Sequence, residues 1–117
     1  MSFVYLSEIT PDVQEISLPG EITVNFTISG GKEVAIDLFY QLNHSNNIYF
    51  QDGNSKFVKE LSKTMVHKGV DKKMTVKLKL EKLADSPKDY KYCFIYVQVV
   101  NKTNKLSDIK HCMIRFI

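Results

Sequence analysis

The sequence predicts a single all-β domain spanning residues 1–117, built as an antiparallel sandwich or barrel of seven or eight short strands. Apolar and polar residues alternate with a period of two over most of the chain, which is the pattern of half-buried strands. Turn signals recur between the alternating runs at spacings of roughly 8 to 15 residues, as all-β folds require. The length of 117 residues suits one domain and is sufficient to bury a core without metals or disulfides.

Each expected strand is marked by its own run of alternation. The runs, in chain order, are an edge strand at Met1–Leu6, an irregular strand at Val13–Leu18, clean strands at Ile22–Ile28 and Val34–Leu42, a short strand at Ile48–Phe50, and further strands at Met74–Leu80, Tyr90–Val100 and Ile109–Ile117. Gly30-Gly31 and Asp52-Gly53 are strong turn signals, and the first of them predicts a hairpin.

One segment, Ser55–Met65, is ambiguous. Phe57, Leu61 and Met65 are spaced by four, which fits a helical turn that Ser55 caps, and the same residues also fit a strand. We expect a connection that contains one helical turn or forms an edge strand.

The most informative run is Tyr90–Val100, because it is apolar on both of its faces. One face carries Cys93 and the β-branched residues that follow it, and the other carries Tyr92, Phe94 and Tyr96. A strand of this composition is expected to contact something on each side.

The order of the strands resembles that of immunoglobulin-like and fibronectin-III-like β-sandwiches. The resemblance rests on the Ile22–Ile28, Val34–Leu42 and Met74–Leu80 strands, and on the closing hairpin; the loop Asp85–Tyr90 also resembles the corner that leads into strand F. It is limited to architecture, because the chain has no Trp and carries Phe26 where antibody-type domains have a Cys.

The resemblance implies that Val34–Leu42 (strand C) and the closing hairpin (strands F and G) are neighbours in one sheet. Their outward residues then form an exposed apolar patch, and Tyr, Phe, Met and Arg are the residue types enriched at interface cores. The predicted binding residues are Phe39, Tyr92, Phe94, Tyr96, Met113 and Arg115. The alternative is that Ser55–Met65 or the N-terminal strand covers this face and makes it a second core.

The two cysteines are expected to be buried and reduced. A register that pairs Cys93 with Cys112 would set Lys110 on the buried side, which is costly for an unpaired charge. In a second register the partner strand is displaced by four residues, so that Cys93 lies opposite Phe116 and Val97 lies opposite Cys112. The two thiols are then roughly 13 Å apart. That distance is too long for a disulfide.

Several function classes lack support in the sequence. No catalytic motif, cofactor signature or glycine-rich phosphate loop occurs, and His44, His67 and His111 are scattered without metal-ligand spacing. The net charge is only +3, and Lys73, Lys77 and Lys79 share one outward strand face that we interpret as solvated, so nucleic-acid binding is not expected.

Signals for targeting or for covalent modification give little support to any location or modification of this protein. No apolar run approaches a membrane span and no signal peptide is visible, which favours a cytoplasmic protein or a domain excised from a secreted one. Three N-x-S/T sequons begin at Asn25, Asn43 and Asn101; the last two fall in expected loops, and we interpret all three as chance matches.

We therefore expect a non-enzymatic module that uses its aromatic face to bind a protein partner or a second copy of itself. The alternatives are a carbohydrate- or small-ligand-binding module, in which the rings are a stacking platform ringed by Asp37, Gln41 and Gln98, and an accessory domain of a larger enzyme or adhesin.

Overall fold

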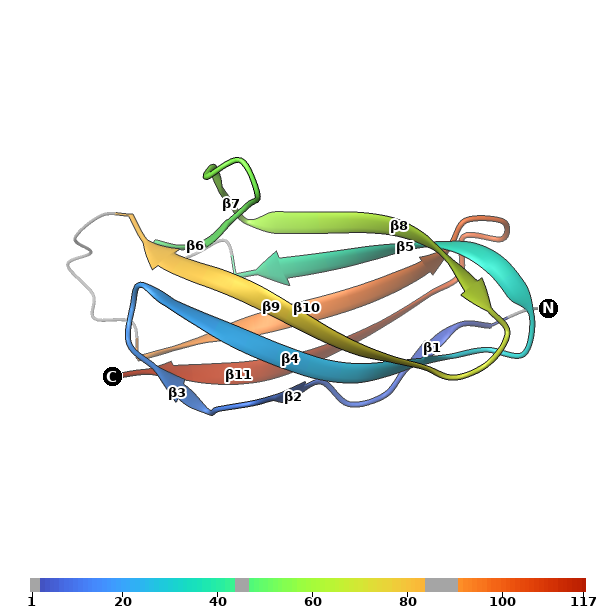
Figure 1. The fold of residues 1–117 in the computed structure, drawn as a ribbon, viewed down its shortest axis with the longest axis horizontal. Helices are drawn as coiled ribbons and strands as arrows, with labels where there is room; N and C mark the ends of the chain where they lie inside the picture. Colours follow the sequence, from blue (N-terminus) through green and yellow to red (C-terminus); the bar gives the residue numbers. More distant parts are fainter. Residues whose placement is uncertain (1–2, 44–46, 84–90) are drawn as a thin grey trace.

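The protein is an all-β structure of two sheets (Figure 1), seen in a computed structural model that describes residues 3–43, 47–83 and 91–117. The described residues contain no helix. Their strands are β1 (Tyr5–Leu6), β2 (Thr10–Pro11), β3 (Glu15–Ile16), β4 (Gly20–Ser29), β5 (Glu33–Leu42), β6 (Ile48–Gln51), β7 (Phe57–Val58), β8 (Glu60–Lys68), β9 (Lys72–Lys82), β10 (Tyr92–Asn101) and β11 (Ser107–Phe116). The described strands outnumber the seven or eight that we predicted. Four of them, β1, β2, β3 and β7, are only two residues long.

The strands divide into two layers that lie one over the other in a sandwich-like arrangement. The first sheet has the order β1-β4-β9-β6-β7, with β2 also pairing with β4, and the second has the order β3-β11-β10-β5-β8. The pairs are antiparallel except β3 with β11, which is parallel. The predicted adjacency of the Val34–Leu42 strand and the closing hairpin is confirmed, because β5, β10 and β11 are neighbours.

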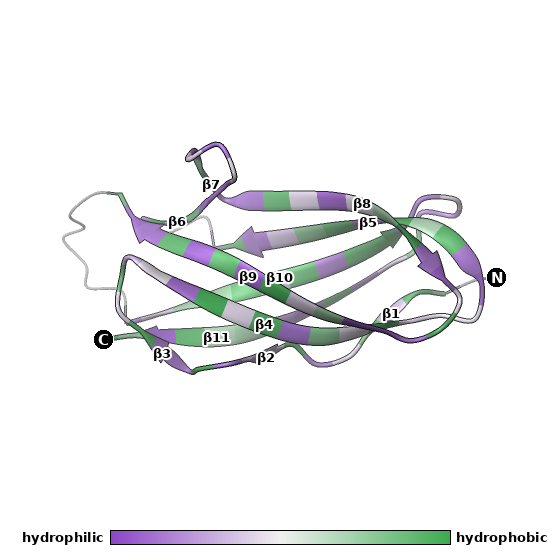
Figure 2. Cartoon of the chain, viewed as in Figure 1, coloured by the Kyte–Doolittle hydropathy of each residue, from purple (hydrophilic) through white to green (hydrophobic). Residues whose placement is uncertain are grey.

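The core lies between the inner faces of the two sheets, as the period-two pattern predicts. Figure 2 shows the corresponding bands of hydrophilic and hydrophobic residues along β4 and β9. The fully or nearly fully buried set from the long strands is Ile22, Val24, Phe26, Ile28, Ile36, Leu38, Tyr40, Leu42, Leu78, Leu80, Ile95, Val97, Val99 and Ile114.

The connection at Gly30-Gly31 is not the hairpin that we predicted. It joins β4 of the first sheet to β5 of the second, so it crosses between layers. The chain is crowded there, since a Cβ on Gly30 would stand 2.8 Å from the carbonyl oxygen of Phe3. His67, which the sequence analysis did not place in the core, is 2% exposed, and its Nε2–H donates to the Gly30 carbonyl at 2.9 Å.

The ambiguous segment Ser55–Met65 is an edge strand. It provides β7 and most of β8, and β8 closes one side of the second sheet by pairing with β5 along its whole length. The edge-strand interpretation is therefore confirmed, and the helical turn is not present.

The N-terminal segment passes from one layer to the other. β1 and β2 pair with β4 in the first sheet, whereas β3 pairs with β11 in the second. The Leu6 N–H donates to Asp108 Oδ2 at 2.8 Å, which links β1 to β11 across the two sheets.

The register of the closing hairpin was predicted wrongly. Cys93 stands opposite Ile114, and Cys112 stands opposite Ile95. In the two registers that we considered, the residue opposite Cys93 is two residues before or two residues after Ile114. The thiols are therefore diagonal neighbours at about 7 to 8 Å, and both are buried and unbonded. Lys110 does lie on the inner side, but it is partly exposed at the sheet edge and its Nζ is 3.5 Å from Asp108 Oδ1.

Of the sequons, Asn101 is not in an open loop but is the last residue of β10, 1% exposed. Its Oδ1 accepts the N–H groups of Thr103 and Asn104, which closes the turn into β11. Asn25 is exposed on β4, where its Oδ1 accepts the Thr75 hydroxyl. His44 and Ser45, which complete the sequon at Asn43, lie outside the described residues, and so does the corner Asp85–Tyr90.

Within the described residues, no helix has the length and apolar character needed to cross a bilayer.

Candidate functional site

The candidate site is the outer surface of the second sheet, where β5, β10 and β11 lie side by side. We call it the aromatic face. The alternation of β10 buries Cys93 and Ile95 and turns the residues between them outward. The predicted binding residues on the aromatic face are Phe39 from β5, Tyr92, Phe94 and Tyr96 from β10, and Met113 and Arg115 from β11.

Four rings on this face form one continuous cluster. The Phe94 ring centroid is 5.6 Å from that of Tyr92, 6.3 Å from that of Tyr96 and 5.6 Å from that of His111, and the last two rings are 5.5 Å apart. These separations lie in the range of favourable aromatic pairs, several of them edge-to-face. Phe94 is the centre of the cluster because it contacts all three of the other rings.

Met113 and Arg115 extend the cluster toward the sheet edge. Met113 stands opposite Phe94 and is 41% exposed, and Arg115 stands opposite Tyr92, which is 51% exposed. The Arg115 guanidinium lies 4.0 Å from the carboxylate of Glu15 on β3, so this end of the face has a charged rim.

Phe39 lies apart from the ring cluster. It stands opposite Gln98, one row beyond Tyr96, and it is half-buried. The face also includes two residues that we did not place among the binding residues: His111, which joins the rings, and Ile109, which is 50% exposed opposite Gln98. Both share their side of β11 with Met113, so the period of two was the signal that could have found them.

Neither of the segments that we considered as a cover lies over the aromatic face. β8 lies beside β5 in the plane of the second sheet, and β3 lies beside β11 in the same plane. β1 and β2 belong to the first sheet. No segment within residues 3–43, 47–83 and 91–117 therefore covers the rings, of which Tyr92 and His111 are exposed and Phe94 and Tyr96 are half-buried.

The position of Phe94 is fixed by a hydrogen bond from its backbone N–H to the side chain of Asn43. β5 ends at Leu42, so the Phe94 N–H has no strand partner there and instead donates to Asn43 Oδ1 at 2.8 Å. The Lys59 ammonium donates to the carbonyls of Asn43 and Ile48 and lies 4.3 Å from the centroid of the Tyr49 ring. Burial lowers the pKa of Lys59. Lys59 therefore stabilises the position of Asn43, whose side chain accepts the hydrogen bond from the Phe94 N–H.

The nucleophilic groups of the fold lie on the opposite, inner side of the sheet. Burial raises the pKa of the Cys93 thiol to about 12, with a further rise from nearby Cys112, whose own pKa burial raises to about 11. Thiols held protonated in this way are inert. Across the part of the chain that the structure describes, no group of three or more His, Cys, Asp or Glu side chains could hold a metal ion.

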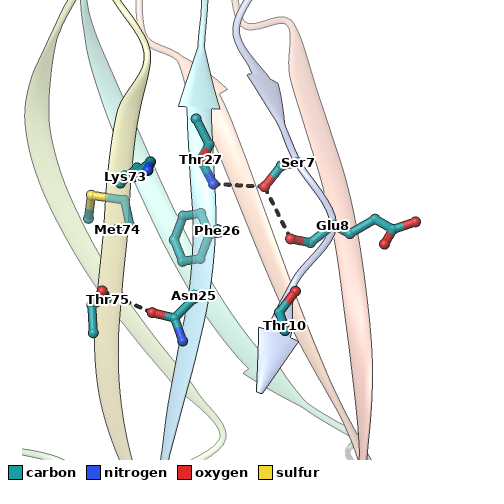
Figure 3. Close-up of a pocket in the computed structure, with 9 residues that line it drawn as sticks. All are labelled: Ser7, Glu8, Thr10, Asn25, Phe26, Thr27, Lys73, Met74 and Thr75. Atoms are coloured by element: carbon teal, nitrogen blue, oxygen red, sulfur yellow. Dashed lines mark hydrogen bonds between the residues drawn. The ribbon is translucent and has the colours of Figure 1, made fainter. Parts of the chain in front are cut away.

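A shallow hollow on the first sheet is a weaker candidate (Figure 3). It lies beside β4, between the residues that pair with β4 as β1 and those that pair with it as β2. Its volume of about 260 Å³ is below the usual range of volumes for ligand sites. Several of its polar groups already pair with one another: the Thr27 N–H donates to Ser7 Oγ, and the Thr75 hydroxyl donates to Asn25 Oδ1.

Comparison of the sequence with models of protein families gives no match, and comparison with curated proteins gives none either. The proposal of a function therefore depends on the geometry of the aromatic face.

Proposed function

We propose that this protein is a non-enzymatic binding module that uses the aromatic face to dock a partner protein or a second copy of itself. The observation that supports the proposal is the ring cluster around Phe94, which is continuous and has no cover among the described residues. Large aromatic side chains that stay solvent-exposed are typical of interaction surfaces.

The composition of the face suits a protein interface. Phe94 and Tyr96 are its central anchors, Tyr92 and Phe39 flank them, and the Arg115–Glu15 pair belongs to a polar rim. The rings already contact one another, so their side chains lose little conformational freedom when a partner docks. That preorganisation lowers the cost of association.

The layout of the sandwich supports the finer proposal of an immunoglobulin-like architecture. The proposal assigns β4 and β9, which pair in the first sheet, to strands B and E, and it assigns β5, β10 and β11, which are neighbours in the second sheet, to strands C, F and G. The short β6–β7 hairpin precedes β8 and pairs with β9, so the connection between strands C and E is longer than a single added strand.

A carbohydrate-binding module is the second candidate. The observation in its favour is that amides border the rings, because Gln41 stands opposite Tyr96 and Gln98 stands opposite Phe39. Amide groups beside a stacking platform can bind sugar hydroxyls. A titration with a panel of simple sugars, followed through the amide resonances of β10, distinguishes this function from protein binding.

The test of the proposed function is a double replacement, Phe94→Ser with Tyr96→Ser. Sedimentation at micromolar concentration and capture of partners from a lysate would be compared with the wild-type chain. We expect the variant to keep its fold and to lose either self-association or a captured protein, because the anchors of the interface are gone.

The matched control is Phe3→Ser with Tyr5→Ser. These two rings are also exposed and stacked, at 5.8 Å, but they belong to β1 of the first sheet and to the residues just before it. The control should keep the mass and the partners of the wild-type protein. Equal behaviour of the wild-type chain and the Phe94/Tyr96 variant in both assays would contradict the proposal.

A further inference from the structure

A second interaction surface, independent of the aromatic face, lies at an unpaired edge of the first sheet. β6 pairs with β9 only at Lys79–Lys82, whereas β4 pairs with β9 from Lys72 to Leu80. Figure 1 shows β6 meeting only the end of β9 that lies at the left of the view. Among the described residues, no strand pairs with residues 72–78 of β9 on the side away from β4. We call these residues the free edge.

The hydrogen-bonding groups of the free edge can be assigned. The Leu83 N–H donates to the Asn47 carbonyl beyond the end of β6, so the alternate residues that precede Leu83 point the same way. The free edge therefore presents the backbone N–H and C=O groups of Lys73, Thr75 and Lys77. β4 supports this assignment, because its Thr23 and Thr27 N–H groups point away from β9, to Asp12 and Ser7.

The space beside the free edge is bordered by apolar side chains that are only partly buried. Met74 and Val76 of β9 and Leu61 and Met65 of β8 pack against the core from the open side of the sandwich. An apolar hollow of about 310 Å³ lies at the end of the free edge, under the connection from β8 to β9, and Met65, His67 and Val70 line it. An added strand could bury alternate side chains here.

The charge of the free edge is positive. Its Lys72, Lys73 and Lys77 form no ion pair within residues 3–43, 47–83 and 91–117, and neither does Lys63 of β8. Asp71, which precedes Lys72, is the acidic residue that lines the hollow. The free side of β8 differs, because Glu60 and the Glu33–Lys68 pair offset its lysines. An acidic partner strand is therefore favoured beside β9 and not beside β8.

A second copy of the chain does not fit this edge. Two free edges that pair antiparallel about Thr75 would place Lys73 of one copy opposite Lys77 of the other. Like charges directly opposite each other are destabilising, and edge lysines are a common protection against self-pairing.

We propose that the free edge of β9 binds an extended acidic segment of a partner protein by β-strand addition, in line with β6. Backbone groups of the partner pair with Lys73, Thr75 and Lys77; its acidic side chains lie among the lysines, and its alternate apolar side chains point toward Met74 and Val76. Because β6 runs antiparallel to β9, a partner strand that continues its direction brings its C-terminal apolar residue to the hollow beside His67.

The experiment uses the full chain and a labelled synthetic peptide as long as the free edge, in which glutamate alternates with valine and the last residue is leucine. Fluorescence anisotropy measures its binding. One control peptide has lysine in place of each glutamate, and a second carries N-methyl groups at the backbone positions that would face β9. We expect both controls to bind at least about tenfold more weakly, since each removes an attraction or several hydrogen bonds.

The protein variants are Thr75→Pro and its match Thr64→Pro. Each removes one N–H that points away from the neighbouring strand, and each also removes a side-chain hydrogen bond, to Asn25 or to Asp37. An edge strand tolerates proline where its N–H faces solvent. We expect Thr75→Pro to weaken the acidic peptide about tenfold or more and Thr64→Pro to leave its affinity within about twofold.

Several results would overturn the assignment. These are no binding of the acidic peptide at millimolar concentration, equal binding of the lysine peptide, greater sensitivity to Thr64→Pro, or a wild-type dimer that Thr75→Pro dissociates. If Thr75→Pro fails to fold, hydrogen exchange of the wild-type chain decides. Added peptide must then slow the Lys73, Thr75 and Lys77 amides, and unchanged exchange there refutes the proposal.

Discussion

Replacing two neighbouring residues of β10 tests the assignment of its inner and outer faces. Ile95 is fully buried between the sheets, whereas Phe94 is half-buried on the aromatic face, where its ring contacts those of Tyr92, Tyr96 and His111. Ile95→Ala leaves a cavity in a close-packed core, and Phe94→Ala removes a ring from a surface that solvent can refill. The two substitutions should therefore differ in cost although the residues are adjacent.

The magnitudes follow from burial. Truncation of a buried isoleucine to alanine costs about 2 to 5 kcal/mol of the free energy of unfolding. Loss of the Phe94 ring removes three aromatic contacts and part of its apolar area, about 1 to 2 kcal/mol in all. In a domain of this size 1 kcal/mol corresponds to about 3 to 5 °C in Tm, so Ile95→Ala should lower Tm by about 6 to 25 °C and Phe94→Ala by about 3 to 10 °C.

The assay is thermal unfolding followed by circular dichroism at low protein concentration, with urea unfolding as a second measure. Low concentration matters because self-association through the aromatic face would add to the apparent stability of the wild-type chain. An equal loss of Tm in the two variants would mean that Phe94 belongs to a second core, and the reasoning that assigns it to a binding surface would fail.

Three further predictions concern the buried groups that hold the fold together. The unfolded chain ionises its thiols above the ordinary pKa of 9.0, while folded Cys93 stays protonated until about pH 12, so stability falls as the pH rises between those values, by about 1.4 kcal/mol per pH unit for this thiol; Cys93→Val should remove that part of the slope in urea unfolding at pH 8 to 11. Asp108→Ala leaves the buried Leu6 N–H without its acceptor, which should cost about 1 to 3 kcal/mol and expose the N-terminal segment to limited proteolysis, whereas Asp108→Asn should not. Asn43→Ala removes the acceptor of the Phe94 N–H, so hydrogen exchange at that amide should accelerate, and unchanged exchange would mean that Asn43 does not position the ring cluster.

The sequence predicted which residues of β5, β9, β10 and β11 point outward, but not the buried side of β8, because Ser55–Met65 fitted both a strand and a helical turn. A period of two leaves little freedom once one face must leave water, and the burial of β5, β9 and β10 follows it. The same parity turned Tyr92, Phe94 and Tyr96 outward. The aromatic face can therefore be located from the alternation of the sequence alone.

The failures concern features that parity does not determine. A shift of the β10–β11 register by two residues keeps every side chain on its own face, so the alternation could not select the observed pairing of Cys93 with Ile114. The Gly30-Gly31 signal marks a turn but not the layer to which the next strand belongs. His67 shares the inner parity of Met65, yet its burial depends on the tertiary contact with Gly30.

The free edge of β9 shows the limit of sequence reasoning most directly. Its alternation of lysine and threonine with apolar residues looks the same whether a strand covers it or not, and we interpreted its lysines only as a solvated face. The difference is that β6 ends at Gln51, so no strand of the described chain pairs with Lys73, Thr75 and Lys77 on the side away from β4. Such a gap depends on the length of another strand, which no local pattern in β9 records.

The two proposed surfaces depend on different chemical groups, and this makes them separable. The aromatic face acts through side chains on the outside of β10 and β11, and serine substitutions remove it while leaving the backbone ladder in place. The free edge acts through backbone N–H and C=O groups of β9, which side-chain truncation does not touch and proline does. Because β9 and β10 lie in different sheets, a partner on one surface need not displace a partner on the other, and the two proposals together describe a single small domain that joins two proteins.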